Sequence, residues 1–167
     1  MESRAKFLGH PLHQQLIAFP LGLLGMAVIF DIISFATQNT IWTNIAFYMI
    51  GAGIVTGLLA AVFGLVDWIA IPNGTRAKSV GLMHGLGNVV VVVAFLASFY
   101  LRWPDPIGAS TLAYVCSFVG FIIALFTGWL GGELVDRLGV GVDDGAHLDA
   151  PSSLSSRSAT PRHRPAA

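Results

Sequence analysis

Residues 45–71 read IAFYMIGAGIVTGLLAAVFGLVDWIAI and carry one charged side chain, that of Asp67. An α-helix needs ~20 consecutive apolar residues to cross the hydrocarbon core of a bilayer, so this stretch is long enough to span it. It is too long for a β-strand, and glycine is common in membrane helices. The stretch therefore predicts a transmembrane helix.

Three further apolar runs of similar length surround it, at about residues 12–35, 80–101 and 111–130. Charged residues make up only 11% of the chain, whereas a soluble domain has roughly a quarter. We therefore expect an all-α fold, an integral membrane four-helix bundle over residues 1–142. Residues 143–167 are rich in Ser, Pro, Ala and Arg, a composition that predicts a disordered tail.

The distribution of Lys and Arg predicts the orientation of this bundle. These residues occur before the first run, between the second and third runs, and after the fourth. The first loop, residues 37–44, has none, and the third loop has only Arg102. Cytoplasmic loops are enriched in Lys and Arg, so we expect a multi-pass inner-membrane protein with both termini in the cytoplasm.

Composition also excludes several classes of function. The formal net charge of +0 argues against nucleic acid as a partner, because that partner requires a basic face. A single cysteine, Cys116, excludes an intrachain disulfide and a cysteine-based zinc or iron–sulfur site. No Ser-His-Asp set or phosphate-binding loop is evident, so no catalytic residue is predicted and an independent enzyme is the least favoured interpretation. Small residues along the second and fourth runs would allow self-association within the lipid bilayer.

Histidines and acidic residues inside the four runs or at their very edges gather at the predicted cytoplasmic end, and among them only Asp31 lies near the other end. Pro11 suits the first position of a helix, which would place two histidines on one face of its first turn. The helix dipole favours neutral imidazole near helix N-termini, and carboxylates near helix C-termini require a cation. We therefore predict a site for a first-row divalent metal ion with five ligands: His10, His13, Asp67, His84 and Glu133.

A second version of this site is a haem b ligated by His84 and by either His10 or His13. Asn88 follows His84 by one helical turn and could orient its ring or bind a ligand. Mixed imidazole and carboxylate ligands favour the bare ion over haem. In a purely structural alternative, Arg76, Lys78 or Arg137 pairs with the acids and the histidines bind backbone groups. For Asp31 we expect a structural ion pair with Arg102.

The first and second runs together resemble the third and fourth. Each pair of runs begins with histidine and ends with an acidic residue that follows glycine, Asp67 in one and Glu133 in the other. Two hairpins related by an axis along the membrane normal would bring both histidine entries and both acidic ends together.

The chain resembles a bacterial family of small four-helix membrane proteins, domain of unknown function 2231, from Gly9 to Val142. The resemblance rests on these segments: Gly9–His13, Phe19–Leu24, Asp31, Gly57–Trp68, His84–Asn88 and Gly128–Leu134. Gln14 departs from the family, which often has a proline there, and this leaves the start of the first helix open. Some relatives carry a Rieske-type iron–sulfur domain, which implies an electron-transfer setting, although a single cysteine cannot hold such a cluster here.

These observations favour a redox module of the membrane, one that binds a metal ion or haem and acts with a redox partner protein. A small transporter or proton-relay protein is the second interpretation, although the sequence offers no continuous polar path across the bilayer. A structural subunit of a larger membrane complex is the third.

Overall fold

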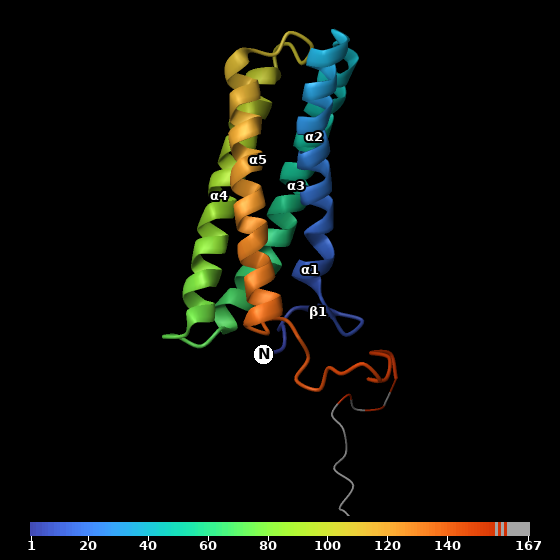
Figure 1. Ribbon diagram of the computed structural model, residues 1–167, viewed down its shortest axis with the longest axis vertical. Coiled ribbons are helices and arrows are strands. Elements are labelled where there is room, and N and C mark those ends of the chain that lie inside the picture. Colours follow the sequence, from blue (N-terminus) through green and yellow to red (C-terminus); the bar gives the residue numbers. More distant parts are fainter. Residues whose placement is uncertain (156, 158, 160–167) are drawn as a thin grey trace, which may run out of the picture.

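The computed structural model describes residues 1–155, 157 and 159. Four long helical segments run side by side along the molecule (Figure 1). In chain order the elements are β1 (Lys6–Phe7), β2 (His10–Pro11), α1 (Leu12–Leu16), α2 (Ala18–Thr37), α3 (Ile41–Ala70), α4 (Arg76–Arg102), α5 (Thr111–Gly132) and the π-helical turn η1 (Glu133–Arg137). Each of α1–α2, α3, α4 and α5–η1 is long and apolar enough to cross a membrane. The predicted four-helix membrane bundle is confirmed.

The helices extend further than the apolar runs that predicted them. α3 begins at Ile41 rather than at residue 45, and α4 begins at Arg76 rather than at residue 80. Polar caps explain both early starts, because the first backbone N–H groups of a helix need acceptors from outside it. The Thr75 hydroxyl oxygen accepts a hydrogen bond from the Lys78 N–H at 3.1 Å, and Asn39 Oδ1 accepts one from the Ile41 N–H at 3.1 Å.

The first membrane span begins at Leu12, as predicted, and follows a short hairpin. Leu8 and Gly9 both have positive φ angles, of 51° and 84°, and they join β1 to β2 in a two-residue turn. Pro11 is therefore the residue before α1, with an extended ψ of 123°, and not part of the first helical turn. The expectation that His10 and His13 share one face of a helix is wrong, because His10 belongs to the hairpin.

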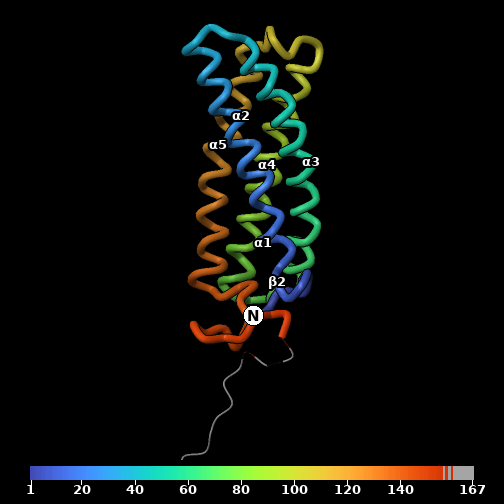
Figure 2. The backbone as a smooth tube through the Cα atoms, turned by 90° about the vertical axis from the view of Figure 1, so that its right-hand side faces the viewer, coloured from blue at the N-terminus to red at the C-terminus, as the bar shows by residue number. Residues whose placement is uncertain are grey.

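The bundle consists of two helical hairpins. α2 makes its most extensive contacts with α3, and α4 with α5, while α3 against α4 forms the larger of the two interfaces between hairpins. Figure 2 shows all four helices nearly aligned with one long axis. The buried apolar core lies midway along it and comprises Leu24, Ala27, Val28, Ala46, Ile50, Ile54, Val91 and Phe95. Large apolar side chains such as Leu58, Val93 and Ile122 are more than half exposed, as expected for helices that face lipid.

The two ends of the bundle differ in what they carry. The N-terminus, the α3–α4 turn and the segment after α5 share one end, which we call the terminal end (Figure 1, bottom). The α2–α3 and α4–α5 loops share the opposite end, which we call the far end. Polar side chains inside the bundle form one layer toward each end, and the apolar core separates the two layers.

The layer toward the far end is a buried ion pair between Asp31 on α2 and Arg102 on α4. The guanidinium donates two hydrogen bonds to the carboxylate, at 3.0 and 2.7 Å, and both side chains are 0% exposed. The Arg102 Nε–H also donates to the Ser98 hydroxyl at 3.1 Å, and the guanidinium lies 4.6 Å from the centre of the Tyr114 ring. Two-point pairing and further hydrogen bonds are what a buried ion pair requires. The predicted pair is confirmed.

The terminal end is covered by the segment that precedes the first helix. The Ser3 hydroxyl and the Arg4 backbone N–H each donate to the Asp67 carboxylate at 2.8 Å. The Lys6 ammonium pairs with Asp143, and this hydrogen bond, with a second one to Glu2, raises the pKa of Lys6 above its usual value. The sequence predicts a disordered tail over residues 143–167. Of these, residues 156, 158 and 160–167 lie outside the described residues.

Candidate functional site

The layer toward the terminal end contains two histidines, one from each helical hairpin. His13 lies on α1, and its ring Nδ1 is 2.8 Å from the backbone carbonyl oxygen of Ala60 on α3. Gly64 lies one helical turn after Ala60, and a Cβ atom at Gly64 would stand only 2.8 Å from His13 Cε1. The glycine therefore allows the imidazole to lie directly against the α3 backbone.

His84 has the same arrangement in the other hairpin. Its Nδ1 is 2.8 Å from the carbonyl oxygen of Thr127 on α5. Gly131 lies one turn after Thr127, and a Cβ atom there would stand 3.3 Å from His84 Cε1. Each histidine thus binds the backbone of its neighbouring helix beside a glycine.

The two imidazole rings lie close together across the bundle. Their centroids are 6.2 Å apart, and their planes are nearly perpendicular, at 88°. A carbonyl oxygen can only accept a hydrogen bond, so each Nδ1 must carry the proton. In a neutral ring the lone pair then lies on Nε2, and this is the tautomer that metal-binding histidines adopt when a backbone carbonyl orients them.

Asn88 completes the surroundings of His84, as the sequence suggested. Its side-chain amide donates to His84 Nε2 at 3.1 Å and to the His84 carbonyl at 3.0 Å. Its Oδ1 accepts a hydrogen bond from the Thr127 hydroxyl at 3.0 Å. Since Thr127 also accepts from the His84 ring, these three residues form a closed hydrogen-bonded network between α4 and α5.

The other three predicted metal ligands lie apart from this pair. The Asp67 carboxylate accepts hydrogen bonds from the N-terminal segment, and Glu133 forms an ion pair with Arg76 at 2.7 Å. His10 is exposed in β2, with its Nε2 3.4 Å from the Ser153 hydroxyl. Within residues 1–155, 157 and 159, His, Cys, Asp and Glu side chains form no group of three or more that could hold a metal ion.

The matched contacts reveal an internal repeat with a different register from the predicted one. The spacing of His13, Leu24 and Asp31 recurs in His84, Phe95 and Arg102, and that of Gly53, Ala60 and Gly64 recurs in Gly120, Thr127 and Gly131. A Cβ atom at Gly53 would meet Leu24, and one at Gly120 would meet Phe95. In this register Asp67 corresponds to Leu134, so the histidine entries are equivalent and the acidic ends are not.

Comparison with protein families agrees with this architecture. The family model described as "Predicted membrane protein (DUF2231)" matches residues 9–144. The chain belongs to this family. No curated protein and no solved structure matches this chain. The match covers both hairpins and therefore includes His13, His84 and the ion pair between Asp31 and Arg102.

The structural alternative from the sequence, in which the histidines bind backbone groups and Arg76 pairs with an acid, agrees with these contacts of this DUF2231 protein. Sequence reasoning did not identify which backbone groups the histidines bind. Ala60 and Thr127 contribute carbonyl oxygens, which side-chain identity does not reveal. The available signal was the glycine one turn after each of them, Gly64 and Gly131. Glycines that recur at matched positions beside matched histidines indicate close contact between ring and backbone, which is more specific than general helix packing.

Proposed function

We propose that this membrane domain binds a redox-active metal centre through the Nε2 atoms of His13 and His84, with haem b as the favoured form. The observation that carries the proposal is the pair of hydrogen bonds from Nδ1 to backbone carbonyls. Both fix the tautomer that places the lone pair on Nε2, and both orient the rings from outside the site. Four-helix bundles commonly build such sites from side chains on facing helices.

The separation of the rings is compatible with one metal ion between them. A metal–nitrogen bond of roughly 2.1 Å on each side would hold two imidazole centroids about 5–6.5 Å apart, depending on the angle between the two bonds, and the rings of His13 and His84 are 6.2 Å apart. Coordination of His84 requires the Asn88 amide to turn away from Nε2. The Thr127 hydroxyl and the His84 carbonyl, which already contact that amide, offer alternative partners for it.

The positions of the carboxylates favour haem over the bare ion. A site with mixed ligands would use Asp67 and Glu133, but the first accepts hydrogen bonds from the N-terminal segment and the second pairs with Arg76. His13 and His84 would be sufficient protein ligands for a haem iron, whereas a zinc-like ion needs about four ligands. Haem is therefore the form that requires no further protein ligand.

The setting we propose is the bacterial inner membrane, with the terminal end and the histidine pair on the cytoplasmic side. The charge rule supports this orientation, because Arg4, Lys6, Arg76 and Lys78 all lie at that end. A centre in that leaflet would exchange electrons with a redox partner protein at the same side of the membrane.

A proton relay is the second candidate, because His84, Asn88 and Thr127 form a hydrogen-bonded chain inside the bundle. The distance to the next polar layer counts against it. His84 and Arg102 are five turns apart on α4, ~27 Å along its axis. The buried side chains between these layers on α4 include Val91 and Phe95, which offer no proton carrier.

The decisive experiment is to purify the full chain in detergent from haem-replete cells and record oxidised and reduced visible spectra with metal analysis. We expect a Soret band that disappears in His13→Ala and in His84→Ala and persists in His10→Ala, whose ring lies in the exposed hairpin. Size-exclusion profiles should be unchanged in all three variants. Stoichiometric metal without colour, lost in the same two variants, would replace haem by a bare ion.

Wild-type protein with neither haem nor metal would refute the proposal, as would an equal loss in His10→Ala. In that case, proton flux into liposomes that contain a pH-sensitive dye tests the relay. Flux that depends on His84 would support it.

A further inference from the structure

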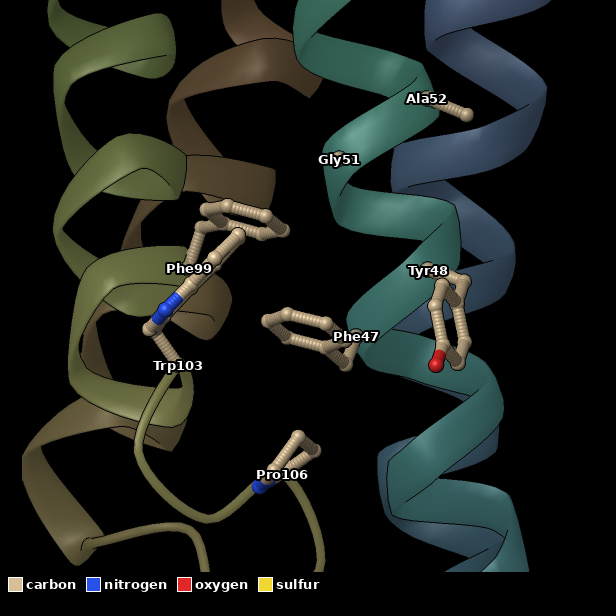
Figure 3. A pocket seen from close by; sticks show the side chains of 7 residues that line it. All are labelled: Phe47, Tyr48, Gly51, Ala52, Phe99, Trp103 and Pro106. Atoms are coloured by element: carbon tan, nitrogen blue, oxygen red, sulfur yellow. The ribbon is translucent and has the colours of Figure 1, made fainter.

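The two ends of the bundle are covered in different ways. At the far end, aromatic side chains lie between α3 and α4: Figure 3 shows Phe99 and Trp103 of α4 beside Phe47 of α3, and the Phe47 and Phe99 rings stack with centroids 4.6 Å apart. At the terminal end the cover comes from the chain outside the helices, and Figures 1 and 2 both show the N-terminus beneath the helix ends. We call residues 3–5, which belong to this cover, the strap.

The strap is attached to α3 through the Asp67 carboxylate and to α1 through its own backbone. The Ser3 hydroxyl lies 2.8 Å from both carboxylate oxygens, and the backbone N–H groups of Arg4 and Ala5 donate to Oδ1 at 2.8 and 3.4 Å. The Ala5 carbonyl oxygen accepts a hydrogen bond from the Leu12 N–H at 2.8 Å. Among the described residues, only those of the strap donate hydrogen bonds to Asp67.

This attachment lies one helical turn from the contacts of His13. Ala60, Gly64 and Asp67 follow one another at positions i, i+4 and i+7 and therefore share one face of α3. The His13 ring binds the Ala60 carbonyl and lies against Gly64. The next position on this face toward the terminal end belongs to Asp67, so the strap covers the histidine pair from that end, on the side of His13.

The internal repeat shows that the fold does not need a carboxylate at this position. Counted from Gly64 and Gly131, the equivalent of Asp67 is Leu134 of η1, and both residues are 9% exposed. Burial stabilises a leucine, whereas a buried carboxylate costs free energy unless it is hydrogen-bonded. The first half therefore carries an acid where an apolar residue would serve, and the strap supplies its hydrogen bonds.

The strap also has a counterpart in the second half. Residues 3–6, SRAK, recur as residues 75–78, TRAK, and a histidine follows soon after each copy. In the second copy Thr75 caps α4, a 27-residue helix that continues without interruption through His84. In the first copy the β1–β2 hairpin separates the motif from α1. The strap can therefore detach without unwinding a helix, and the second copy cannot.

We propose that the strap is a releasable lid, latched by Asp67, and that solutes from the aqueous phase reach the histidine pair on the side of His13 when it opens. Segments held by few contacts outside the core open locally while the rest of a protein stays folded. His84 belongs to the uninterrupted α4, and its Nε2 is hydrogen-bonded to the Asn88 amide at 3.1 Å. The second half therefore offers no equivalent opening.

The lid rests on the proposed function in taking the histidine pair as the site that it covers. The strap contacts Asp67 and not the imidazole rings, and the His13 ring keeps its own contact with Ala60. Release of the strap therefore controls how fast a ligand enters, and not how much of it is bound at equilibrium.

The test measures how fast diethyl pyrocarbonate, which acylates neutral imidazole nitrogen, labels each histidine of the full chain in phospholipid nanodiscs. The chain is produced in cells that make no haem and is treated with a chelator, and peptide mass spectrometry locates the label. The result therefore does not depend on whether the site binds a cofactor. In wild type we expect fast labelling of His10, which is exposed, and slow labelling of the half-buried His13 and His84.

Asp67→Leu gives α3 the residue that the second half has at the equivalent position. It should raise the labelling rate of His13 at least about tenfold, because hydrogen bonds to a charged group are lost, and leave His84 unchanged. Ser3→Ala changes no helix and should act in the same direction by a smaller factor. Arg76→Met is the matched control, because it breaks the contact of the second copy of the motif with Glu133 and should change neither rate.

Wild-type His13 that reacts as fast as His10 would overturn the proposal, because the strap would then cover nothing. Unchanged labelling of His13 in both Asp67→Leu and Ser3→Ala would also overturn it. So would an equal increase at His13 and His84, which indicates loosening of the whole bundle. A wild-type protein without haem or metal would refute the proposed function and leave these rates as they are.

Discussion

Replacing one member of the buried pair between Asp31 and Arg102 should destabilise the bundle far more than replacing both. In Arg102→Met the carboxylate loses the guanidinium hydrogen bonds of 3.0 and 2.7 Å and stays fully buried. In Asp31→Leu the guanidinium is left without its counter-ion. Removing one partner of a buried ion pair costs about 3–5 kcal/mol, and we expect each single variant to lose this much.

The double variant Asp31→Leu with Arg102→Met should recover most of this loss. Replacing a buried pair by apolar side chains of similar volume is often neutral or stabilising. The Ser98 hydroxyl would keep a partner, because it already donates to the Ala113 carbonyl at 2.7 Å. We therefore expect a stability within about 1 kcal/mol of wild type and a coupling energy of several kcal/mol.

Unfolding in mixed micelles, followed by circular dichroism and tryptophan fluorescence, measures these free energies. Arg76→Met is the matched control, since it breaks the ion pair with Glu133. The Arg76 side chain in that pair is 62% exposed. Exposed pairs contribute about 0–1 kcal/mol, so the control should unfold almost like wild type. The reasoning is refuted if the buried and exposed single variants lose the same stability, or if the double variant loses the sum of the two buried single variants.

Three further predictions concern the terminal end. Gly64→Ala should displace His13 more than Gly131→Ala displaces His84, because the added Cβ atoms would stand 2.8 and 3.3 Å from the respective rings. We expect Gly64→Ala to lower the free energy of unfolding by ~1–3 kcal/mol, and an equal effect of both variants would contradict this. Asp67→Asn should weaken the attachment of the N-terminal segment and increase hydrogen exchange there without changing the metal or haem content, and unchanged exchange would speak against the contact. Asn88→Ala should increase the amount of haem that the purified chain binds in a titration, because the Asn88 amide competes for His84 Nε2. Reduced haem binding would show that Asn88 instead positions the His84 ring.

Apolar runs were sufficient to predict the four helices, because crossing a bilayer imposes a length and composition that few other structures need. The ion pair was also predictable, since Asp31 and Arg102 are the charged residues nearest to the far end on their helices. The hairpin before the first span was not, because the Leu8–Gly9 turn places His10 and Pro11 in β2, where Pro11 was expected to begin the helix. Proline suits both an extended segment and the first turn of a helix, so the presence of Pro11 does not decide between the two structures.

The sequence predicted only part of the candidate site. His13, His84 and Asn88 come together, and the register of the hairpins determines this. The partners of the acids depend on tertiary contacts that sequence spacing does not specify, such as the approach of Ser3 to Asp67. The prediction grouped residues by membrane depth, and depth alone does not distinguish opposite sides of a bundle.

The repeat places Asp31 and Arg102 at equivalent positions of the two hairpins, so each half carries the complement of the other. A symmetric dimer of the first hairpin would bring two carboxylates together, and a dimer of the second would bring two guanidinium groups together. Like charges at such a distance are strongly unfavourable where water is excluded. Each half is therefore selective for its counterpart over its own copy, and a chain divided at the α3–α4 turn should reassemble only as a mixed pair.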